Sequence, residues 1–503
     1  MKTCIVLTIA LVSLAVAGKV EKVAKDFTAS QKQQMDVFLG NQAISKPQNF
    51  PTKLNEHIVE REFTTRVDHF NLQRTDTWTA RYLVNPEHYL PGGPILILLG
   101  GNGDIDPFYL GEGNLIYDIA EALNGVVIAY ESRFYGDSHV GLEDTSLENL
   151  RLLNLDQMLA DLAEFVQHVK EHEVDYENTN VLVAGSGLGG ALATWFRVRY
   201  PHLAQGLWSS SGFHRASIDY YEFAEAWSQT LIDFGSQQCY NDIFVAFHVM
   251  ENLFDAGYTE VINDRFNLCT PIEEGNELQL QFFLSQLMGY VEGGTLLAQN
   301  VSSFDQVCAE ITGADVPTSL DAFARWFNEN FFAEGCALSS LEDFAQLFSG
   351  TAWDHPAVRF GNRQVFYQRC TEVGWFRTAN SQDQPFGNRI SVDMYAETCR
   401  RVFGDWFTVE SLNRNAERTN TRFGGDSPVI SNAHFVNGAE HPWRTVSIVD
   451  PRGPDASAQM IPRELLSADL WSISEQDSDE LREAKLLVKE KVTEFMYPRT
   501  PRV

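Results

Sequence analysis

Short apolar runs alternate with segments of helical periodicity along the first half of this chain. The runs from Pro94 to Leu99, Gly125 to Tyr130 and Val181 to Ala184 have the length of buried strands. Between them, Leu115 to Leu123 and Leu155 to Val169 repeat apolar residues at the spacing of an amphipathic helix. Buried strands that alternate with helices predict a parallel sheet with helices packed on it, which is an α/β fold.

Further strands are expected on both sides of a long helical region. Trp78 to Val84 and Gly206 to Ser210 extend the sheet in the first part of the chain. From Gly212 to Cys399, strand signals are scarce and aromatic-rich helical segments dominate. Pro428 to Val436 and Thr445 to Val449 then resume the strand pattern. The helical region is therefore predicted to be an insertion between two parts of one sheet.

The N-terminus has the features of a secretory signal. Lys2 supplies a positive charge, Ile5 to Val16 is an apolar core, and Ala15 and Ala17 form an A-x-A cleavage site. The apolar stretch is shorter than a membrane-spanning helix, and no later segment has about 18 uninterrupted apolar residues. We therefore expect a secreted protein, or one in the lumen of the secretory and lysosomal system, without a membrane anchor.

These patterns divide the chain into four parts, and an amphipathic helix from Ser478 to Met496 is predicted near its end. The sequence contains no internal repeats. The predicted parts are a signal peptide at 1–17, an N-terminal arm at 18–62, an α/β domain at 63–211 and 400–497, and a helical cap domain at 212–399.

The net charge of the chain limits the classes of molecule that it can bind. It has 38 Lys and Arg residues against 68 Asp and Glu, a net charge of −30. Such a surface repels the phosphates of nucleic acids and anionic membranes. We therefore expect no nucleic acid partner and no membrane partner.

Six cysteines remain once Cys4 leaves with the signal peptide. An even number in a secreted chain favours three disulfides. Their spacing matches no zinc pattern and C-x-x-C is absent, so we expect no metal site. Asn300 begins an Asn-Val-Ser sequon, which predicts N-glycosylation on the surface of the same region. The six are Cys239, Cys269, Cys308, Cys336, Cys370 and Cys399.

The six residues from Gly185 to Gly190 carry the candidate chemistry. They follow a buried run and precede a helix-like stretch, Ala191 to Tyr200. Two interpretations fit a strand, a glycine turn and a helix. As G-x-G-x-x-G, the turn would cradle a dinucleotide. As G-x-S-x-G, it would be a nucleophile elbow with Gly187 in place of the serine.

The residues around the turn favour the elbow. A dinucleotide site needs an acidic residue about 20 positions further on, and Ala191 to Ile218 contains none. An elbow needs small residues two positions before and after the nucleophile, and Gly185 and Gly189 fill those positions. If Ser186 were the nucleophile instead, Leu188 would clash at the second of them. The nucleophile position has a positive φ, which glycine adopts freely.

Seven stretches of the chain carry a family resemblance. They are Asp68 to Asn71, Trp78 to Tyr82, Gly92 to Ile95, Gly100 to Gly103, Glu131 to Ser138, Gly189 to Pro201 and Cys370 to Phe376. Together they resemble the prolylcarboxypeptidase family of serine peptidases, peptidase family S28, which includes lysosomal prolylcarboxypeptidase, dipeptidyl peptidase 7 and thymus-specific serine protease. The resemblance implies an α/β-hydrolase fold with a large inserted helical cap. It also implies three disulfides in the cap, which are Cys239–Cys308, Cys269–Cys336 and Cys370–Cys399.

The family cleaves after proline with a Ser, Asp, His triad, and the resemblance places each member on this chain. The serine of the family's GGSYGG falls on Gly187, the aspartate of its NG-x-x-DPW on His441, and the histidine of its G-x-AHC-x-D on Ala456. No histidine follows His441. The resemblance also implies an oxyanion hole made by the backbone N–H groups of Leu188 and the Gly101 loop.

These substitutions imply a secreted member of the family that has lost catalysis and acts by binding. Its expected partner is a peptide, an extracellular protein or a second copy of this chain, and no cofactor is expected. Two alternatives stay open. One is an active serine-type exopeptidase, a prolyl carboxypeptidase or dipeptidyl peptidase, that uses Ser186 as a displaced nucleophile. The other, more remote, is a dinucleotide-binding enzyme.

Overall fold

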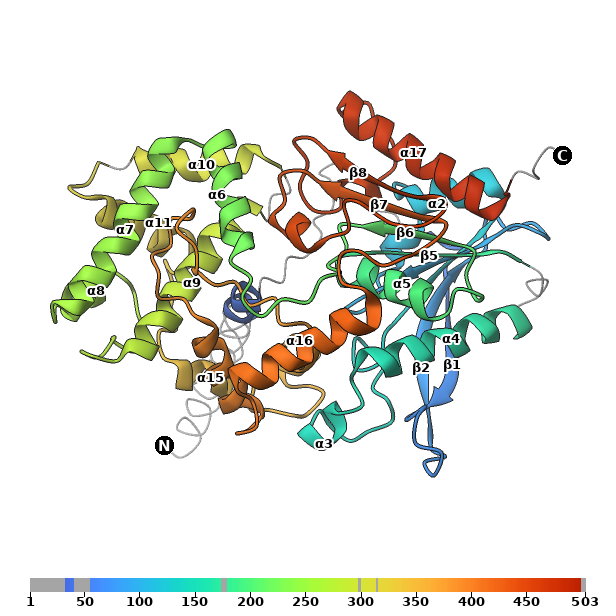
Figure 1. Cartoon of the computed structure of the whole chain (residues 1–503), viewed down its shortest axis with the longest axis horizontal. Helices are drawn as coiled ribbons and strands as arrows, with labels where there is room; N and C mark the ends of the chain where they lie inside the picture. The colour runs from blue at the N-terminus through green and yellow to red at the C-terminus, as the bar shows by residue number, and fades with distance from the viewer. Residues whose placement is uncertain (1–31, 40–54, 173–178, 297–299, 314, 499–503) are drawn as a thin grey trace, which may run out of the picture.

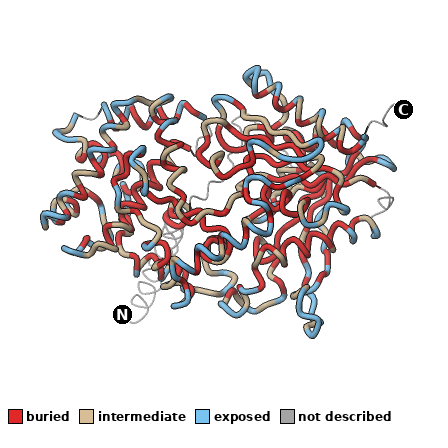
Figure 2. The backbone as a smooth tube through the Cα atoms, viewed as in Figure 1, coloured by how far each residue is buried: buried red, intermediate tan, exposed pale blue. Residues whose placement is uncertain are grey.

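The structure is a computed structural model that describes residues 32–39, 55–172, 179–296, 300–313 and 315–498. The signal peptide predicted at 1–17 lies outside these residues. Figure 1 shows a helical region on one side of the molecule and a sheet flanked by helices on the other. Figure 2 shows that buried residues gather in the sheet and in the helices that face one another.

One sheet of eight strands forms the centre of the α/β part. The strands are β1 (Val59–Arg66), β2 (Thr77–Asn85), β3 (Ile95–Leu99), β4 (Val126–Tyr130), β5 (Val181–Ser186), β6 (Gly206–Ser210), β7 (Ala433–Gly438) and β8 (Ala456–Ile461). Their spatial order is β1-β2-β4-β3-β5-β6-β7-β8. The β1–β2 and β2–β4 pairs are antiparallel, and every pair from β4 to β8 is parallel.

Helices cover both faces of this sheet. On one face pack α4 (Leu155–His172) and α5 (Leu188–Arg199), and on the other α2 (Leu115–Leu123) and α17 (Asp479–Met496) (Figure 1). A mostly parallel sheet between two helical layers, in this strand order, is the α/β-hydrolase fold. Shorter elements of this part are η1 (Pro107–Leu110), α3 (Leu147–Leu150), η3 (Pro442–Val446) and η4 (Ala468–Leu470).

A large helical region is inserted between β6 and β7. Its elements are α6 (Glu222–Phe234), α7 (Gln237–Asp255), α8 (Thr259–Asn263), α9 (Glu277–Leu296), α10 (Ser302–Thr312), α11 (Ser319–Phe331), α12 (Leu341–Leu347), α13 (Pro356–Arg359), α14 (Asn362–Gln368), the π-helical turn η2 (Arg369–Val373), α15 (Val392–Phe403) and α16 (Val409–Phe423). The predicted boundary at residue 399 falls inside α15, and strand pairing resumes only in β7. None of the helices described is long and apolar enough to cross a membrane.

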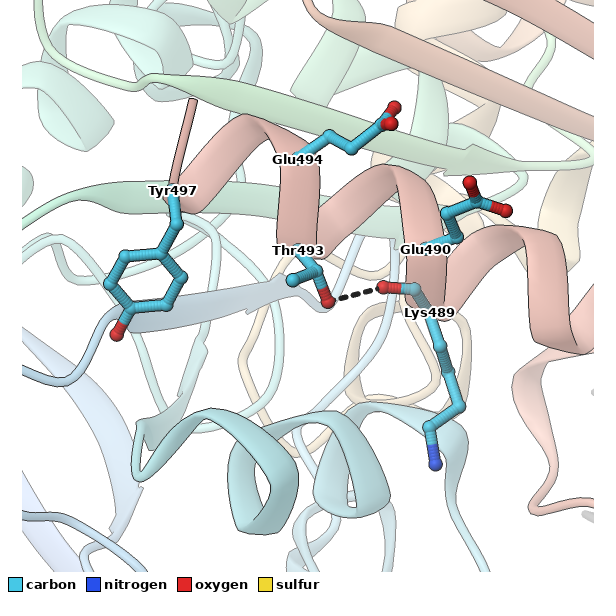
Figure 3. A pocket seen from close by; sticks show the side chains of 5 residues that line it. All are labelled: Lys489, Glu490, Thr493, Glu494 and Tyr497. Carbon is cyan, nitrogen blue, oxygen red and sulfur yellow. Dashed lines mark hydrogen bonds between the residues drawn. The ribbon is translucent and has the colours of Figure 1, made fainter. Parts of the chain in front are cut away.

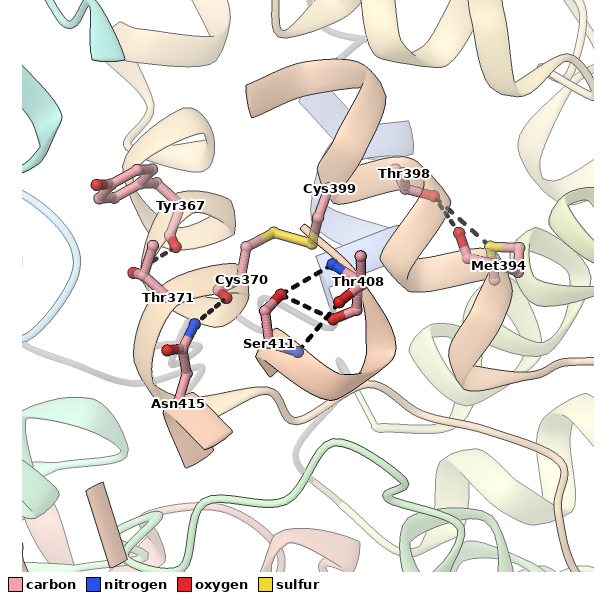
Figure 4. Close-up of a disulfide and its surroundings, with 9 residues drawn as sticks. All are labelled: Tyr367, Cys370, Thr371, Met394, Thr398, Cys399, Thr408, Ser411 and Asn415. Atoms are coloured by element: carbon pink, nitrogen blue, oxygen red, sulfur yellow. Dashed lines mark hydrogen bonds between the residues drawn. A yellow bond between two sulfur atoms is a disulfide. The ribbon is translucent and has the colours of Figure 1, made fainter. Parts of the chain in front are cut away.

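Three disulfides lie within the inserted region, and they join the pairs that the family resemblance implies. Figure 4 shows the third, which ties η2 to α15. Beside it, the Asn415 amide on α16 donates to the carbonyl of Cys370 at 3.2 Å. The turn η2 is thereby held against two helices. The pairs are Cys239–Cys308, Cys269–Cys336 and Cys370–Cys399.

The N-terminal arm, predicted to be irregular over 18–62, contributes regular structure in its described part. Residues 32–39 form a helix, and β1 begins at Val59, inside the predicted arm. The helix is too short for its apolar residues to produce a periodic signal. Its buried apolar residues are Met35, Phe38 and Leu39.

The last two strands also differ from the prediction. The segment 445–449, expected as a strand, lies at the end of the 3-10 turn η3 and just after it. Its Val446 and Ile448 side chains are buried, so this apolar run fills the core without pairing in the sheet. The final strand is β8, whose Ala-Ser-Ala-Gln start has weak strand propensity.

A buried ion pair joins α4 to the loop after β4. Arg133 and Asp161 are both buried, and the Arg133 Nε lies 2.5 Å from Oδ2 of Asp161. The ring of His69 also contacts Asp161, with Nε2 2.6 Å from Oδ1. Glu131, which is buried two residues before Arg133, pairs instead with Arg81 at 2.6 Å. His69, Arg81, Glu131 and Arg133, which belong to the resembling stretches, therefore make structural ion pairs and hydrogen bonds.

We expect Asp161→Ala to lower the free energy of unfolding by about 3–5 kcal/mol, because it leaves the buried Arg133 charge without its partner. The matched control is Asp76→Ala, which breaks the exposed pair with Arg74 and should cost less than about 1 kcal/mol. Chemical denaturation of both variants measures the difference. Equal losses of unfolding free energy in the two variants would show that the buried pair contributes no more to stability than the exposed one.

Candidate functional site at the glycine turn

The glycine turn lies between the end of β5 and the start of α5. Gly187 is the one residue between them, with φ of 54° and ψ of −120°. Its N–H donates to the carbonyl of Ser210 on β6 at 3.1 Å, and its carbonyl accepts from the N–H of Ala191 at 3.0 Å. The turn is thereby tied to the neighbouring strand and to the helix. It lies at the carboxyl edge of the parallel strands, where open α/β sheets bind ligands.

Glycines let three backbone segments touch at this turn. A Cβ on Gly185 would lie 2.4 Å from the carbonyl carbon of Gly189, and a Cβ on Gly189 would lie 2.4 Å from the carbonyl oxygen of Leu99. A Cβ on Gly101 would lie 2.9 Å from the nitrogen of Gly189. Side chains do not fit at such distances. The geometry is that of a nucleophile elbow, with glycine required on both sides of residue 187.

Aromatic rings fill the space over Gly187. A Cβ on this residue would lie 3.3 Å from Cε2 of Phe213. The Phe213 ring stacks on Trp443 with centroids 4.1 Å apart, and Trp375 meets both rings edge-on at 5.6 and 5.7 Å. We call Phe213, Trp375 and Trp443 the aromatic wall. No local sequence signal marks this wall, because its members come from three distant segments.

His441 follows β7 and begins the 3-10 turn η3. Its Nδ1 accepts from the backbone N–H of Trp443 at 3.3 Å. The ring is buried, and this burial, together with the charge of Arg444, lowers the pKa of His441 to about 3. The imidazole is therefore neutral near pH 7 and is part of the folded framework.

Ala456 does not lie at the glycine turn. It is the first residue of β8 and pairs with Ala433 at the start of β7, whereas the turn lies at the opposite, carboxyl end of the strands. A base serving residue 187 would have to come from the segment after β8. The prediction that Ala456 holds the base position is therefore corrected. It followed from aligning the family's G-x-AHC-x-D motif with the segment that begins at Gly453.

The segment after β8 reaches the glycine turn at Ser467. The Ser467 hydroxyl contacts that of Ser186, the last residue of β5. The N–H of Ser467 donates to Oγ of Ser211 at 3.0 Å. Two residues further on, the buried carboxyl of Asp469 accepts from Oγ of Ser210 at 2.5 Å, and burial raises its pKa to about 6. These contacts hold the segment against the ends of β5 and β6.

Ser186, the alternative nucleophile, has a hydroxyl as its partner, and a hydroxyl is a far weaker base than an imidazole. The buried ring of His214 is engaged elsewhere. Its Nδ1 accepts from the N–H of Ile448 at 3.2 Å, and its Nε2 lies 3.0 Å from Oγ1 of Thr194. Burial lowers the pKa of His214 to about 3. Among the contacts of the described residues, Ser186 has no imidazole to activate it.

Backbone N–H groups still face the turn. Leu188 begins α5, so its N–H belongs to the first helical turn, where N–H groups have no acceptor within the helix. The Gly101 loop touches the same turn through the contact with Gly189. The family resemblance implies that the backbone N–H groups of Leu188 and of the Gly101 loop form an oxyanion hole. This role stays a prediction.

Other features lie apart from the glycine turn. Asn300 is exposed two residues before α10. Across the described ranges, no three His, Cys, Asp or Glu residues gather in a way that could hold a metal ion.

Figure 3 shows a surface depression formed by residues at the end of α17, none of which belongs to the turn or the aromatic wall. Its lining residues are Lys489, Glu490, Thr493, Glu494 and Tyr497.

Comparison with known proteins identifies the family to which a chain with this geometry belongs. The profile described as serine carboxypeptidase S28 matches residues 65–488, most of the chain. This chain belongs to the serine carboxypeptidase S28 family. The thymus-specific serine protease of Homo sapiens is 27% identical to this S28 chain over 434 residues, which cover 83% of the chain and 82% of the relative.

Two further likenesses extend over most of the chain. The lysosomal Pro-X carboxypeptidase of Homo sapiens is 26% identical over 417 residues, which cover 79% of this S28 chain and 80% of the relative. Among solved structures, a proline iminopeptidase of Mycobacterium smegmatis matches with a TM-score of 0.34 and 13% identity. That match covers 83% of this chain and 95% of the other.

The geometry of the elbow predicts which of two alanine substitutions lowers the free energy of unfolding more. Gly187→Ala strains a positive φ, which costs about 1–3 kcal/mol, and its Cβ meets a ring that can shift. Gly189→Ala should cost more, because its Cβ would overlap the backbone oxygen of Leu99. Chemical denaturation gives both values. A larger loss for Gly187→Ala would contradict the close approach of the backbones.

His441→Asn tests the buried imidazole, because asparagine keeps a side-chain acceptor for the Trp443 N–H. The folded pKa of His441, about 3, lies below its ordinary value of 6.5. Its contribution is therefore complete above pH 6.5 and is lost as the pH falls below it. Relative to the variant, the wild type should lose about 2 kcal/mol of unfolding free energy between about pH 7.5 and pH 5. Parallel stability curves in urea would contradict the buried neutral state.

Proposed function

We propose that this S28 chain is a catalytically inactive member of its family that acts by binding a peptide or an extracellular protein. The observation that carries the proposal is Gly187, which presents no hydroxyl at the elbow. In acyl transfer by serine peptidases, that hydroxyl forms the covalent bond to the substrate carbonyl. Without it, no acyl-enzyme forms at this position.

The other two triad positions support the same proposal. His441 stands where the resemblance places the carboxylate, and a neutral imidazole there cannot stabilise a protonated base. When the family's AHC-x-D is aligned on the aspartate it shares with Asp469, the base position falls on Leu466. Leu466 is apolar and buried. Loss of a whole triad lowers the rate on the order of a millionfold.

The aromatic wall supports binding rather than hydrolysis. The Phe213 ring lies where the side chain of a nucleophile would need space, because even a Cβ on Gly187 would be 3.3 Å from it. Apolar and aromatic side chains predominate in the lining of ligand sites. Phe213 is the partly exposed member of the wall, whereas Trp375 and Trp443 are buried. We therefore expect the Phe213 ring to contact a bound partner, and the two tryptophans and the elbow beneath it to support the ring.

Several features support a place in the secretory pathway or outside the cell. Disulfides such as the three of this chain persist in oxidising compartments. Residues 1–17 have the composition of a signal peptide, and one relative carries the name lysosomal. The exposed Asn300 of the sequon is expected to carry a glycan.

A second candidate function is hydrolysis by an exopeptidase that uses Ser186. It is favoured by one observation, the position of the Ser186 hydroxyl beside Gly187 and in contact with Ser467. A hydroxyl pair lacks the base that a serine nucleophile needs. The two candidates therefore differ in whether Ser186 reacts.

A fluorophosphonate probe separates the two candidates. We expect no covalent labelling of the folded wild-type protein, because Gly187 offers no oxygen and Ser186 has no base. Intact-mass spectrometry measures the label. Labelling of the wild type that disappears in Ser186→Ala would overturn the proposal and establish the displaced nucleophile.

Restoring the triad tests the same proposal in reverse. Gly187→Ser, His441→Asp and Leu466→His, combined with Phe213→Ala to make room over the elbow, should produce labelling. The matched control carries Ala456→His in place of Leu466→His and should remain unlabelled, because Ala456 lies at the far end of β8. Equal labelling of the two combined variants would contradict the placement of the base position after β8.

A further inference from the structure

The helix of the N-terminal arm, residues 32–39, packs against the inserted region with one face. Figure 1 shows it in blue beside the helices of that region. Met35, Phe38 and Leu39 are buried, whereas Gln33 is exposed. Apolar residues at positions i, i+3 and i+4 form one stripe of an amphipathic helix. The arm helix therefore lies at the surface of the molecule, and its apolar stripe is the face that the inserted region contacts.

Phe38 is the central contact of the arm helix. Its ring lies among aromatic side chains from α9, α12, α14 and α15, so one side chain of the arm touches four helices of the inserted region. A buried aromatic anchor of this kind typically dominates the binding energy of an interface. The distances from the Phe38 centroid are 4.6 Å to Phe344, 5.3 Å to Tyr395, 5.8 Å to Phe366 and 6.0 Å to Phe282.

A buried arginine binds the end of the arm helix. Nη2 of Arg377 donates to the carbonyls of Val37 and Phe38, which belong to the last turn, where carbonyls have no acceptor role within the helix. Nη1 of the same guanidinium is bonded to the buried carboxylate of Glu292. A positive charge at this end also complements the helix dipole. The inserted region thus recognises the backbone of the arm as well as its side chains.

Two further contacts bring the arm helix close to the backbone of the inserted region. A Cβ on Gly289 of α9 would lie 2.9 Å from the carbonyl oxygen of Val37 and 2.7 Å from its Cγ1, so glycine leaves the space that Val37 fills. Oε1 of Gln34 accepts from the N–H of Leu338 at 2.9 Å. We call the residues that hold the helix the arm site. They are Phe282, Gly289, Phe344, Phe366, Arg377 and Tyr395.

The arm helix depends on the arm site for its structure. A helix as short as 32–39 is marginal in water on its own. Its helical form is therefore stabilised by the contacts with the inserted region, as in a peptide that folds when it binds. An apolar anchor, a cation for the helix end and room for the backbone are the elements by which proteins bind amphipathic helices.

We propose that the arm site is a binding site for a short amphipathic helix, and that the arm fills it as an internal ligand. The helix carries apolar side chains at i, i+3 and i+4 and ends at the arginine. A covalently attached ligand competes at an effective concentration of about millimolar. The intact chain is therefore closed to added helices, and a cut between the arm and β1 opens the site to exchange. The arm site shares no residue with the glycine turn or the aromatic wall, so this proposal does not rest on the inactive elbow.

Cleavage of the full-length chain between the arm and β1 tests the proposal. The recognition sequence of a specific protease replaces residues 44–50, and the protein is compared before and after cleavage. The probe is a fluorescent peptide with the sequence of residues 28–42, and fluorescence anisotropy measures its binding to dilute protein. We expect the peptide to bind the cleaved protein in exchange for the arm. Binding to the uncleaved protein should be at least about a hundredfold weaker, because the attached arm competes.

Two peptide variants and one protein variant locate the binding. A peptide with Phe38→Ala should bind the cleaved protein at least about a hundredfold more weakly, because the ring is the buried anchor. The matched control is a peptide with Gln33→Ala, an exposed position, whose Kd should change by less than about threefold. Gly289→Ala in the protein should weaken binding of the wild-type peptide about tenfold, because its Cβ would meet Val37.

Several results would overturn the proposal. If the cleaved protein takes up no peptide, or loses its circular dichroism signal on cleavage, the arm is part of the core and not a ligand. If the Phe38→Ala and Gln33→Ala peptides bind alike, the peptide binds elsewhere. If the peptide binds the uncleaved protein as tightly as the cleaved protein, the arm does not close the site, and a helix from a second copy or another protein can enter it.

Discussion

The contact between the backbones of Gly185, Gly189 and Leu99 is the constraint on which the rest of the site depends. It brings β3, β5 and α5 closer together than any side chain allows. The chain between them can then turn only at residue 187, with positive φ. None of these contacts involves the side chain of residue 187. The elbow geometry is therefore independent of the nucleophile, and a family fold can keep the turn after the chemistry is lost.

Side chains of the fold itself occupy the surroundings of the elbow. The ring of Phe213 covers Gly187, and the imidazole of His441 is buried against the backbone of Trp443. The hydroxyls of Ser186 and Ser467 meet where the segment after β8 reaches the turn. Each of these groups is held by partners within the fold.

Local sequence features predicted much of this structure. The strands β3, β4 and β5 and the helices α2, α4 and α17 followed from apolar runs and helical periodicity, because the pattern alone fixes their burial. The α/β-hydrolase fold with a disulfide-containing helical insertion is confirmed. The elbow was predictable because its glycines lie within a few residues of one another. The S28 family is confirmed by the match over residues 65–488.

Features that depend on distant contacts were not predictable in this way. Thr445 to Val449 has the composition of a strand but follows a 3-10 turn into the core, whereas Ala456–Ile461 has weak strand propensity and pairs with β7. The position of Ala456 at the start of β8, away from the glycine turn, is likewise set by this strand pairing. The aromatic wall also depends on tertiary packing, since its three members are far apart in the chain.

The central claim is that the elbow no longer performs hydrolysis. Its most direct test is incubation of the wild-type protein with a pool of N-acetylated peptides that contain internal proline, followed by mass spectrometry of every peptide. We predict that all peptides are recovered intact, with a subset retained by the protein during gel filtration. Appearance of products cleaved after proline, at a rate that Ser186→Ala abolishes, would contradict the claim.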